Sequence, residues 1–322
     1  MKAIRVHATG GPEVLRLEEV PVPVPGAGQI VIRVEAAGVN FVDVYHRTGL
    51  YPVALPFTLG REAAGVVERV GEGVGTCRPG DRVASESLIG GYAEYALAAA
   101  ERVVPLPREV SSRVGAAVIL QGLTAHFLAT STYPLRPDDT CLVHAAAGGV
   151  GQLLVQCAKL RGATVIATVG SAEKAEIARA RGADHVILYR EKDFREEVMR
   201  LTGGRGVDVV YDAIGKDTIA RSIRSLRRRG LCINYGGASG LVRSIEPLEL
   251  GEAGSVFFTR PHLADYIASP EELAWRAGDL FAAWREGKLV VTVDREFPLA
   301  EAGAAHRYLE GRKTKGKLLL RV

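Results

Sequence analysis

Hydrophobic and polar residues follow two different patterns, one before and one after roughly residue 120. In the second part, short apolar runs predict buried strands at residues 141–143, 164–168, 185–188, 207–211, 231–235 and 255–258. The stretches between them repeat at helical spacing and predict helices over residues 150–160, 172–180, 193–201 and 218–228. Strands that alternate with helices form parallel sheets with right-handed crossovers. We therefore expect an α/β fold with a doubly wound, six-stranded Rossmann sheet over residues 123–264.

The first part of the chain has a β-rich pattern. Short runs at residues 30–34, 64–70, 82–85 and 92–97 are broken by glycine and proline, which is typical of a partly open, barrel-like β domain. The last segment predicts a helix over 271–286 and strands over 289–293 and 317–322. We expect this segment to complete the first domain, which then comprises residues 1–122 and 265–322. A ligand site is expected in the cleft between the two domains.

Composition narrows the possible functions. The 322 residues are 47% apolar and carry 41 basic against 37 acidic side chains, a net charge of +4. This mixed balance argues against a nucleic-acid-binding surface, and we read the basic cluster Arg227–Arg229 as a helix end. The start of the chain lacks a signal-peptide core, and no apolar stretch approaches the length that spans a bilayer. We expect a soluble, cytoplasmic protein.

A glycine-rich run at residues 144–151 follows the predicted strand 141–143 and opens the predicted helix 150–160. It fits the dinucleotide fingerprint, with Ala146 at the first glycine position, Gly148 at the second and Gly151 at the third. Such a turn lets the backbone approach a pyrophosphate, whose charge the helix N-terminus then meets. The sequence therefore predicts a dinucleotide site.

The end of the next strand indicates which cofactor binds. A site for NADH normally has an acidic residue there to bind the ribose 2′-hydroxyl, and none follows residues 164–168. Gly170 and Ser171 leave room instead, and Lys174 stands one turn into the next helix, where its ammonium could meet a 2′-phosphate. This favours NADPH over NADH.

Several short motifs, together with this architecture, resemble one family along the chain from residue 3 to the C-terminus. The motifs lie at residues 10–15, 40–43, 49–51, 79–83, 122–125, 144–151 and 259–261. They resemble the zinc-independent, zeta-crystallin-like quinone oxidoreductases of the medium-chain dehydrogenase/reductase superfamily. The resemblance implies a GroES-like catalytic domain and hydride transfer from NADPH to a quinone or another conjugated carbonyl compound.

The metal ligands of zinc-dependent relatives are missing. Those enzymes have a cysteine where this chain has Asn40 and a histidine where it has Arg61, so only Glu62 remains of the three ligands. Residues 84–100 contain no cysteine, so the structural zinc lobe is also missing. We predict that no metal is bound.

By resemblance, Asn40 and Tyr45 are the catalytic residues and also contact the cofactor. Asn40 would hydrogen-bond cofactor or substrate oxygen. Tyr45 would either donate a proton or only line the acceptor pocket, with solvent as the donor. The other cofactor contacts that the resemblance and the fingerprint imply are Phe41, Val42, Thr124, Phe127, Gly148, Gly149, Val150, Gly151, Gly170, Ser171, Lys174, Tyr189, Tyr235, Gly236, Gly237, Ala238, Leu263 and Arg312.

Two other functions remain open from the sequence. One is an NADPH-dependent enone or enoyl-thioester reductase, and the other is a cofactor-regulated RNA-binding or structural protein. One-electron and two-electron reduction are not distinguished. The apolar run 255–258 is consistent with an edge strand, and the resemblance implies a homodimer that pairs the Rossmann edges. Two adjacent phenylalanines on an unpaired edge would otherwise promote aggregation, and the alternative is a covered strand within a monomer.

Overall fold

The structure is a computed structural model that describes residues 1–322, and the chain divides into two compact units. Unit 1 comprises Met1–Gln121, Ser269–Arg285 and Val291–Val322, and unit 2 comprises Gly122–Ala268 and Glu286–Val290. Helix α2 (Ser112–Phe127) crosses the boundary between them in the chain.

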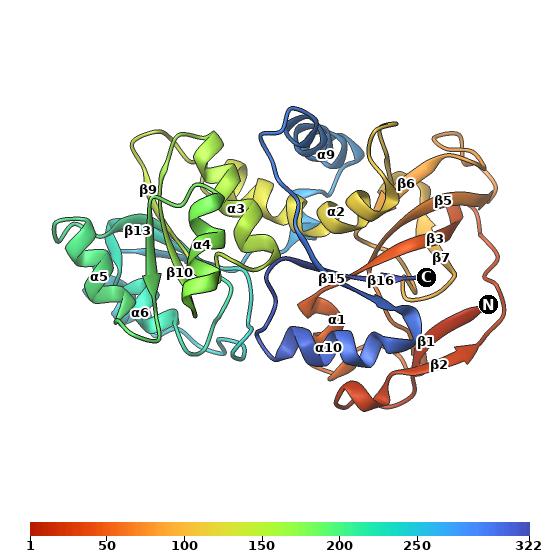
Figure 1. The fold of residues 1–322 in the computed structure, drawn as a ribbon, viewed down its shortest axis with the longest axis horizontal. Helices are drawn as coiled ribbons and strands as arrows, with labels where there is room; N and C mark the ends of the chain where they lie inside the picture. The colour runs from red at the N-terminus through yellow and green to blue at the C-terminus, as the bar shows by residue number, and fades with distance from the viewer. The chain divides into compact units, whose positions relative to one another are not determined.

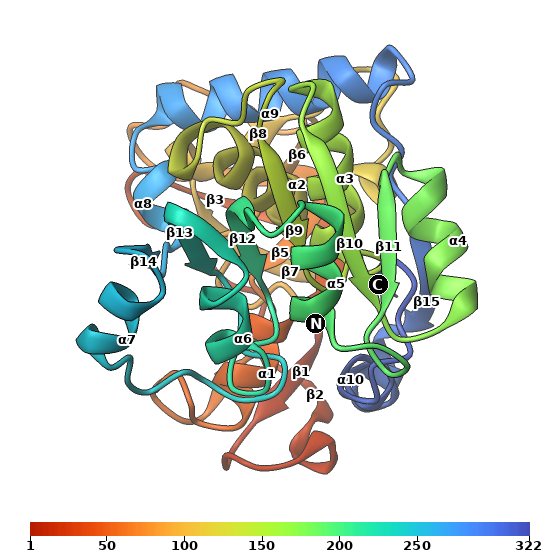
Figure 2. The same ribbon diagram turned by 90° about the vertical axis from the view of Figure 1, so that its left-hand side faces the viewer.

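Unit 2 is built on a parallel sheet of six strands. They are β9 (Thr140–Val143), β10 (Thr164–Val169), β11 (His185–Leu188), β12 (Val207–Asp212), β13 (Leu226–Asn234) and β14 (Phe257–Thr259). Their order is β11-β10-β9-β12-β13-β14, which runs from right to left across Figure 2. The order reverses between β9 and β12, and ligands of such sheets bind at the carboxyl ends of the strands beside this point.

Helices cover both faces of this sheet. They are α3 (Gly149–Leu160), α4 (Ala172–Ala180), α5 (Phe194–Leu201), α6 (Ile219–Ile223), α7 (Pro247–Glu252) and α8 (Leu263–Tyr266). Helices α3 and α4 lie on one face, and α5 and α6 lie on the other (Figure 1). Side-chain caps fix two starts, because Ser171 accepts from Lys174 N–H and Asp193 accepts from the first-turn amides of α5. The predicted doubly wound sheet is confirmed.

One predicted helix is too long. Helix α6 ends at Ile223, and strand β13 begins at Leu226, so Arg227–Arg229 lie in a strand and not at a helix end. An ion pair stabilises the strand conformation here, because the Arg227 guanidinium contacts the buried Asp208 carboxylate on neighbouring β12. Arg229 has a φ of 56°, which marks the irregularity in this pairing.

Unit 1 contains an open, mainly antiparallel sheet in the order β15-β16-β3-β5-β6-β8, with β7 also paired to β3, and a small sheet in the order β2-β1-β4. The strands are β1 (Lys2–Val6), β2 (Arg16–Glu19), β3 (Gln29–Val39), β4 (Phe57–Thr58), β5 (Glu62–Val70), β6 (Arg82–Ser85), β7 (Tyr95–Ala99), β8 (Val104–Pro105), β15 (Val293–Pro298) and β16 (Lys317–Arg321). The helices are α1 (Phe41–Arg47), α9 (Pro270–Arg285) and α10 (Ala302–Glu310). The C-terminal strand β16 pairs with β3.

The strand predicted over 289–293 is wrong. The backbone of Val290 is bonded to a side chain, since Gln156 Nε2 donates to its carbonyl at 3.0 Å and its N–H donates to Gln156 Oε1 at 2.7 Å. The strand of this region, β15, begins only at Val293.

One helical segment meets the length and hydropathy criteria of a membrane span. Ser112–Thr132, which joins α2 to the π-helical turn η3 (Leu128–Thr132), has 21 residues. The sequence-based expectation that no stretch approaches this length is therefore wrong. In its most apolar window, 72% of the segment is buried inside the protein, as is typical of a core helix.

Candidate functional site

The N-terminus of α3 forms the glycine-rich turn of unit 2. Gly148 caps the helix in an extended conformation, and the first-turn amides have no acceptor within the helix. A Cβ on Gly151 would overlap the Ala145 carbonyl oxygen and lie 2.8 Å from Ala146 Cα. Glycine is therefore required for the helix to approach the turn. The turn presents amide donors and the positive end of the helix dipole at the carboxyl end of β9, which suits a pyrophosphate.

A second group of predicted residues meets at the ends of β10 and β11. A Cβ on Gly170 would lie 2.7 Å from the Tyr189 hydroxyl, so the tyrosine fits against this glycine and no larger residue. The Ser171 hydroxyl accepts from Lys174 N–H at 3.3 Å and keeps its own hydrogen to donate. The structure brings these four residues together.

Arg190 is a cation that the sequence analysis did not select. Its Nε lies 3.5 Å from the position of a Cβ on Gly170, beside the Tyr189 hydroxyl. An arginine directly after the predicted strand 185–188 and its tyrosine was the available signal. Arg190 adds positive charge to the place where the sequence predicts a 2′-phosphate.

Asp212, at the carboxyl end of β12, organises the next loop. Its Oδ1 accepts from the Ile214 and Gly215 amides at 2.8 and 2.9 Å, and its Oδ2 accepts from the Thr218 and Ser222 hydroxyls at 2.8 and 2.7 Å. The carboxylate is completely buried. Its acceptor positions are filled by the protein, which makes it a structural residue of the site.

His144, the first residue of the glycine-rich run, continues this network. Because the Ser222 hydroxyl donates to Asp212, it accepts from His144 Nε2 at 3.0 Å, and His144 Nδ1 accepts from the Thr168 hydroxyl at 2.8 Å. Burial lowers the pKa of His144 below its ordinary value. The neutral imidazole thus ties β9 to β10 and α6 beneath the nucleotide turn.

The loop after β13 carries the predicted residues Tyr235–Ala238. A Cβ on Gly236 would lie 2.6 Å from the Ala213 carbonyl oxygen, so this glycine allows the β12 and β13 loops to pack together. Arg260 fixes this loop, because its Nη1 donates to Asn234 Oδ1 at 3.0 Å and to the Gly236 carbonyl at 3.3 Å.

Three further predicted residues of unit 2 lie on the helices α2 and α8 and not on the loops after the strands. Phe127 is buried and stacks on Tyr266, with ring centroids 4.3 Å apart and an interplanar angle of 15°. Thr124 lies on α2 three residues earlier and is half-buried, and Leu263 is half-buried at the start of α8.

In unit 1, Asn40 lies at the centre of a buried polar cluster. Its side-chain Nδ2 donates to Glu62 Oε2 at 2.7 Å, and its Oδ1 accepts from Lys317 Nζ at 2.7 Å. Lys317 also forms an ion pair with Glu62, and both side chains are almost completely buried. The remaining Nδ2 hydrogen has only a long contact of 3.4 Å with the Gly38 carbonyl. This long hydrogen bond is the weakest of the Asn40 amide and the one that a ligand oxygen would displace.

Asp43, one turn into α1, is the most perturbed carboxyl group of this region. Its Oδ2 accepts from Asn40 N–H at 2.9 Å and from the Tyr92 hydroxyl at 3.0 Å, whereas its buried Oδ1 has no partner. Burial raises the pKa of Asp43 from 3.8 to about 7, against the opposing effect of these hydrogen bonds.

Aromatic side chains of α1 and of the segment after it pack against one another. Tyr45 lies between Phe41 and Tyr51, with centroid distances of 6.3 and 5.2 Å, and the Tyr45–Tyr51 pair meets edge to face. Val42 is half-buried on the same helix, and Arg312 is exposed after α10 with a φ of 56°. Each predicted residue of unit 1 is thus placed, and none contributes to a cluster of three metal-ligating side chains.

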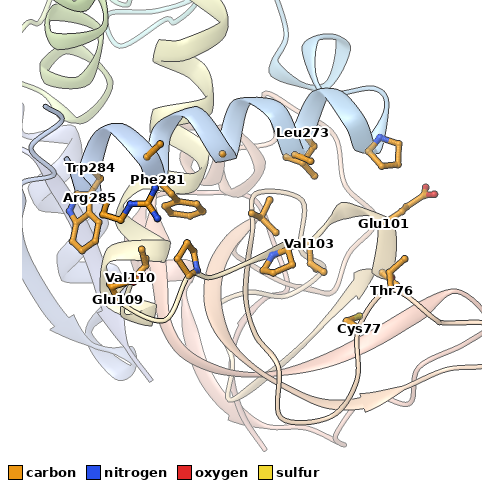
Figure 3. A pocket seen from close by; sticks show the side chains of 18 residues that line it. Thr76, Cys77, Glu101, Val103, Glu109, Val110, Leu273, Phe281, Trp284 and Arg285 are labelled. Atoms are coloured by element: carbon orange, nitrogen blue, oxygen red, sulfur yellow. The ribbon is translucent and has the colours of Figure 1, made fainter. Parts of the chain in front are cut away.

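A cavity of about 620 Å³ lies elsewhere in unit 1, and none of the predicted site residues lines it. Figure 3 shows α9 lying over it, with Leu273 and Phe281 on one side and Val103 and Val110 on the other. Its lining is mostly apolar.

The fold of each unit has a counterpart among family models. Residues 26–108 match the model described as alcohol dehydrogenase GroES-like domain, and residues 149–263 match the one described as zinc-binding dehydrogenase. A GroES-like unit and a Rossmann unit in this order define a medium-chain dehydrogenase/reductase.

Relatives and solved structures narrow the class. The chain is 45% identical to 2-haloacrylate reductase of a Burkholderia species and 43% identical to quinone oxidoreductase 1 of Escherichia coli, over 98% of this chain and 97% and 98% of the relatives. Two structures determined with NADPH superimpose with a TM-score of 0.98 over the full length of both chains, a mycobacterial protein at 47% identity and the Escherichia coli quinone oxidoreductase at 42%. The chain belongs to the zeta-crystallin-like quinone oxidoreductase family, which confirms the resemblance seen in the sequence.

Proposed function

We propose that this chain catalyses the NADPH-dependent reduction of quinones without a metal. The observation that carries the proposal is the group of residues at the ends of β10 and β11. Gly170, Ser171 and Tyr189 meet there, and no acidic residue directly follows strand β10. Arg190 Nε lies near Gly170, and Lys174 stands in the first turn of α4, from where its ammonium would add positive charge. The quinone oxidoreductase relatives and the two NADPH complexes support the same activity.

The residues of unit 2 fit NADPH. The first-turn amides of α3, at Gly149, Val150 and Gly151, would hold the pyrophosphate, and the Ser171 hydroxyl and Lys174 ammonium would hold the 2′-phosphate. Bound NADPH supplies the hydride for the reduction. The protein contributes position and exclusion of water.

Residues of unit 1 would contact the acceptor. The Asn40 amide hydrogen that makes the long bond to the Gly38 carbonyl would donate instead to an acceptor oxygen, on which negative charge develops during the reduction. Tyr45 and Tyr51 provide an aromatic wall for a planar acceptor. The proton comes from the Tyr45 hydroxyl or from solvent.

The residues around Asn40 argue for chemistry without a metal. A divalent cation beside Glu62 would meet the Lys317 ammonium, which is paired with the same carboxylate oxygen. An asparagine amide is also a poor replacement for the cysteine ligand of zinc, and the Arg61 guanidinium cannot replace the histidine ligand.

A second candidate reaction is the reduction of other conjugated acceptors. The 45% identity to 2-haloacrylate reductase specifically favours it, because a 2-haloacrylate is itself a conjugated compound. The same Asn40 hydrogen bond would serve a carboxylate or carbonyl oxygen of such a substrate.

We also propose that the chain forms a homodimer through β14. This strand is an edge of the sheet, and Phe257 on it is 61% exposed. Unpaired apolar edge strands promote association, so self-pairing of β14 would satisfy its free backbone groups. Phe257→Asp is expected to give monomers in analytical ultracentrifugation, and an unchanged dimer would contradict this interface. Placement in the cytoplasm stays a prediction.

Loss of NADPH absorbance at about 340 nm, a property of the reduced nicotinamide, tests the function. The acceptors are ortho- and para-quinones, simple enones and a 2-haloacrylate, each assayed with NADPH, with NADH and with a chelator. Quinone turnover with NADPH that the chelator leaves unchanged is expected. Turnover of the haloacrylate alone would replace the quinone assignment by the second candidate, and NADPH binding without any turnover would overturn both.

A further inference from the structure

Lys317 is the one lysine of unit 1 whose ammonium is buried against a site residue. Three neighbouring strands bring the cluster together, because β16 pairs with β3 and β3 pairs with β5. In this register Gly38 lies opposite both Leu319 and Glu62, which places Lys317 beside Asn40. The cluster is thus fixed by the sheet itself.

The donors and acceptors of the cluster permit only one orientation of the Asn40 amide. An ammonium only donates hydrogen bonds, so the atom that Lys317 contacts must be Oδ1. A carboxylate only accepts, so the atom facing Glu62 must be Nδ2. Glu62 is in turn held by its second oxygen, which accepts from Leu120 N–H at 2.8 Å.

The backbone next to the cluster is shaped for it. A Cβ on Gly38 would overlap Glu62 Oε2 and lie 2.8 Å from Lys317 Nζ. Gly38 has an ordinary extended strand conformation, which any residue could adopt. Glycine is needed here because a side chain would not fit, and not because of the backbone conformation. The ion pair therefore requires glycine at this position.

We propose that Lys317 is a positioning residue, whose ammonium orients the Asn40 amide and balances Glu62 so that one Asn40 N–H points to the acceptor oxygen. The inference rests on the role of Asn40 in the proposed function. Lys317 itself does not touch the reacting atoms. Its ammonium supplies the positive charge that the buried Glu62 carboxylate needs.

Four variants test the proposal. Lys317→Met removes the ammonium, and Lys317→Arg keeps the charge. Gly38→Ala keeps the side chains of Asn40, Glu62 and Lys317, but its Cβ would displace the Glu62–Lys317 ion pair. This variant still tests the proposal if Lys317→Met fails to fold. The double variant with Glu62→Gln and Lys317→Met removes both charges, which is expected to restore the stability that Lys317→Met loses. Lys159→Met, which breaks an ion pair with Asp184 in unit 2, is the control.

The first measurement reads the Asn40 amide directly and needs no turnover. The chain has only two asparagines, Asn40 and Asn234, so selective ¹⁵N labelling gives two side-chain NH₂ pairs in an NMR spectrum. Asn40→Ala assigns them. Lys317→Met, the double variant and Gly38→Ala are expected to shift the Asn40 pair and leave the Asn234 pair in place, while Lys159→Met leaves both unchanged.

The second measurement is quinone reduction. Lys317→Met and the double variant are expected to lower kcat about 10- to 100-fold, less than the roughly 10²- to 10³-fold that complete loss of one oriented donor costs. KM for NADPH should stay unchanged, and Lys317→Arg should keep part of kcat. If the double variant regains wild-type stability, kcat and the Asn40 signal together, Lys317 is only structural and the proposal is overturned. Full kcat in Asn40→Ala would instead overturn the proposed role of Asn40, and the NMR shift alone would then decide whether Lys317 orients the amide.

Discussion

The Tyr92 hydroxyl donates a hydrogen bond of 3.0 Å to the buried carboxylate of Asp43. This bond ends a directed chain. Arg47 can only donate, so it donates to His306 Nδ1 at 3.0 Å, and His306 Nε2 donates to the Tyr92 oxygen at 3.3 Å. Burial and the nearby Arg47 lower the pKa of His306 to about 3, so the imidazole stays neutral. The donors along this chain of Arg47, His306 and Tyr92 therefore all point toward Asp43.

The raised pKa of Asp43 predicts that stability falls as the pH rises. Its pKa is about 7 in the folded chain and 3.8 when unperturbed, so the folded state binds the proton more tightly. The contribution is complete below pH 3.8, declines as the pH rises from 3.8 to about 7, and amounts to about 4 kcal/mol in total. Denaturant unfolding at pH 5 and pH 8 measures the part lost between pH 5 and about 7, which is about 3 kcal/mol.

Asp43→Asn provides the comparison. Other titrating groups contribute equally to both proteins, so the difference between their two pH dependences isolates Asp43. The loss of unfolding free energy between pH 5 and pH 8 is expected to be smaller in the variant. Equal losses would show that Asp43 titrates normally in the folded chain.

Lys174→Ala is expected to weaken NADPH and not NADH. A charge-assisted hydrogen bond to a phosphate contributes about 1.5–3 kcal/mol, so the Kd for NADPH should rise roughly 10- to 100-fold. Fluorescence titration with each cofactor measures the change. Lys192→Ala, on an exposed lysine paired with Glu197 in the same unit, is the matched control. A similar loss for NADH would place Lys174 away from the 2′-phosphate.

Two glycines of the nucleotide turn should differ in their tolerance of alanine. On Gly151 a Cβ meets backbone atoms of Ala145 and Ala146 that cannot move aside, whereas on Gly148 its nearest neighbour is the Ala145 oxygen at 3.2 Å. Gly151→Ala is expected to cost about 1–3 kcal/mol of unfolding free energy, as overpacking does, and to weaken NADPH binding. Gly148→Ala should cost less in both measurements. The reverse order would contradict the close packing of α3.

The parallel sheet could be predicted because its signals are local. The run at residues 207–211 is buried on both faces and is apolar except for Asp208, as buried strands of this kind are nearly continuous in their apolar character. Strand β13 departs from that rule at Arg227, whose charge is neutralised by Asp208 on another strand. A partner distant in sequence decided the structure there, and the local pattern predicted a helix.

The nucleotide turn of the site was also visible locally, since glycine spacing and strand–helix junctions are adjacent in sequence. The cluster around Asn40 was not. In the sequence, Lys317 looks like a surface lysine before an apolar run. Only the pairing of β16 with β3 places it next to Asn40, which is 277 residues away in the chain. The raised pKa of Asp43 could not be predicted either, because the burial that causes it comes from the tertiary fold.

Asp212→Asn should destabilise unit 2 and weaken its cofactor site together. The carboxylate accepts from two backbone amides and two hydroxyls, and an asparagine would turn a donor toward one side of this set. Facing Ser222, that donor leaves the serine hydrogen without an acceptor and competes with His144 for the serine oxygen. We expect about 1–3 kcal/mol less unfolding free energy, the cost of an unsatisfied buried polar group, and a higher Kd for NADPH.

Ser222→Ala separates the two effects of Asp212. It removes the link to His144 but leaves the amides of Ile214 and Gly215 and the Thr218 hydroxyl bound to the carboxylate. Because the loop after β12 keeps its anchor, this variant should lose stability while NADPH binding changes little. If Ser222→Ala weakens NADPH as much as Asp212→Asn does, the His144 link positions the nucleotide turn. The loop after β12 would then have no separate role in cofactor binding.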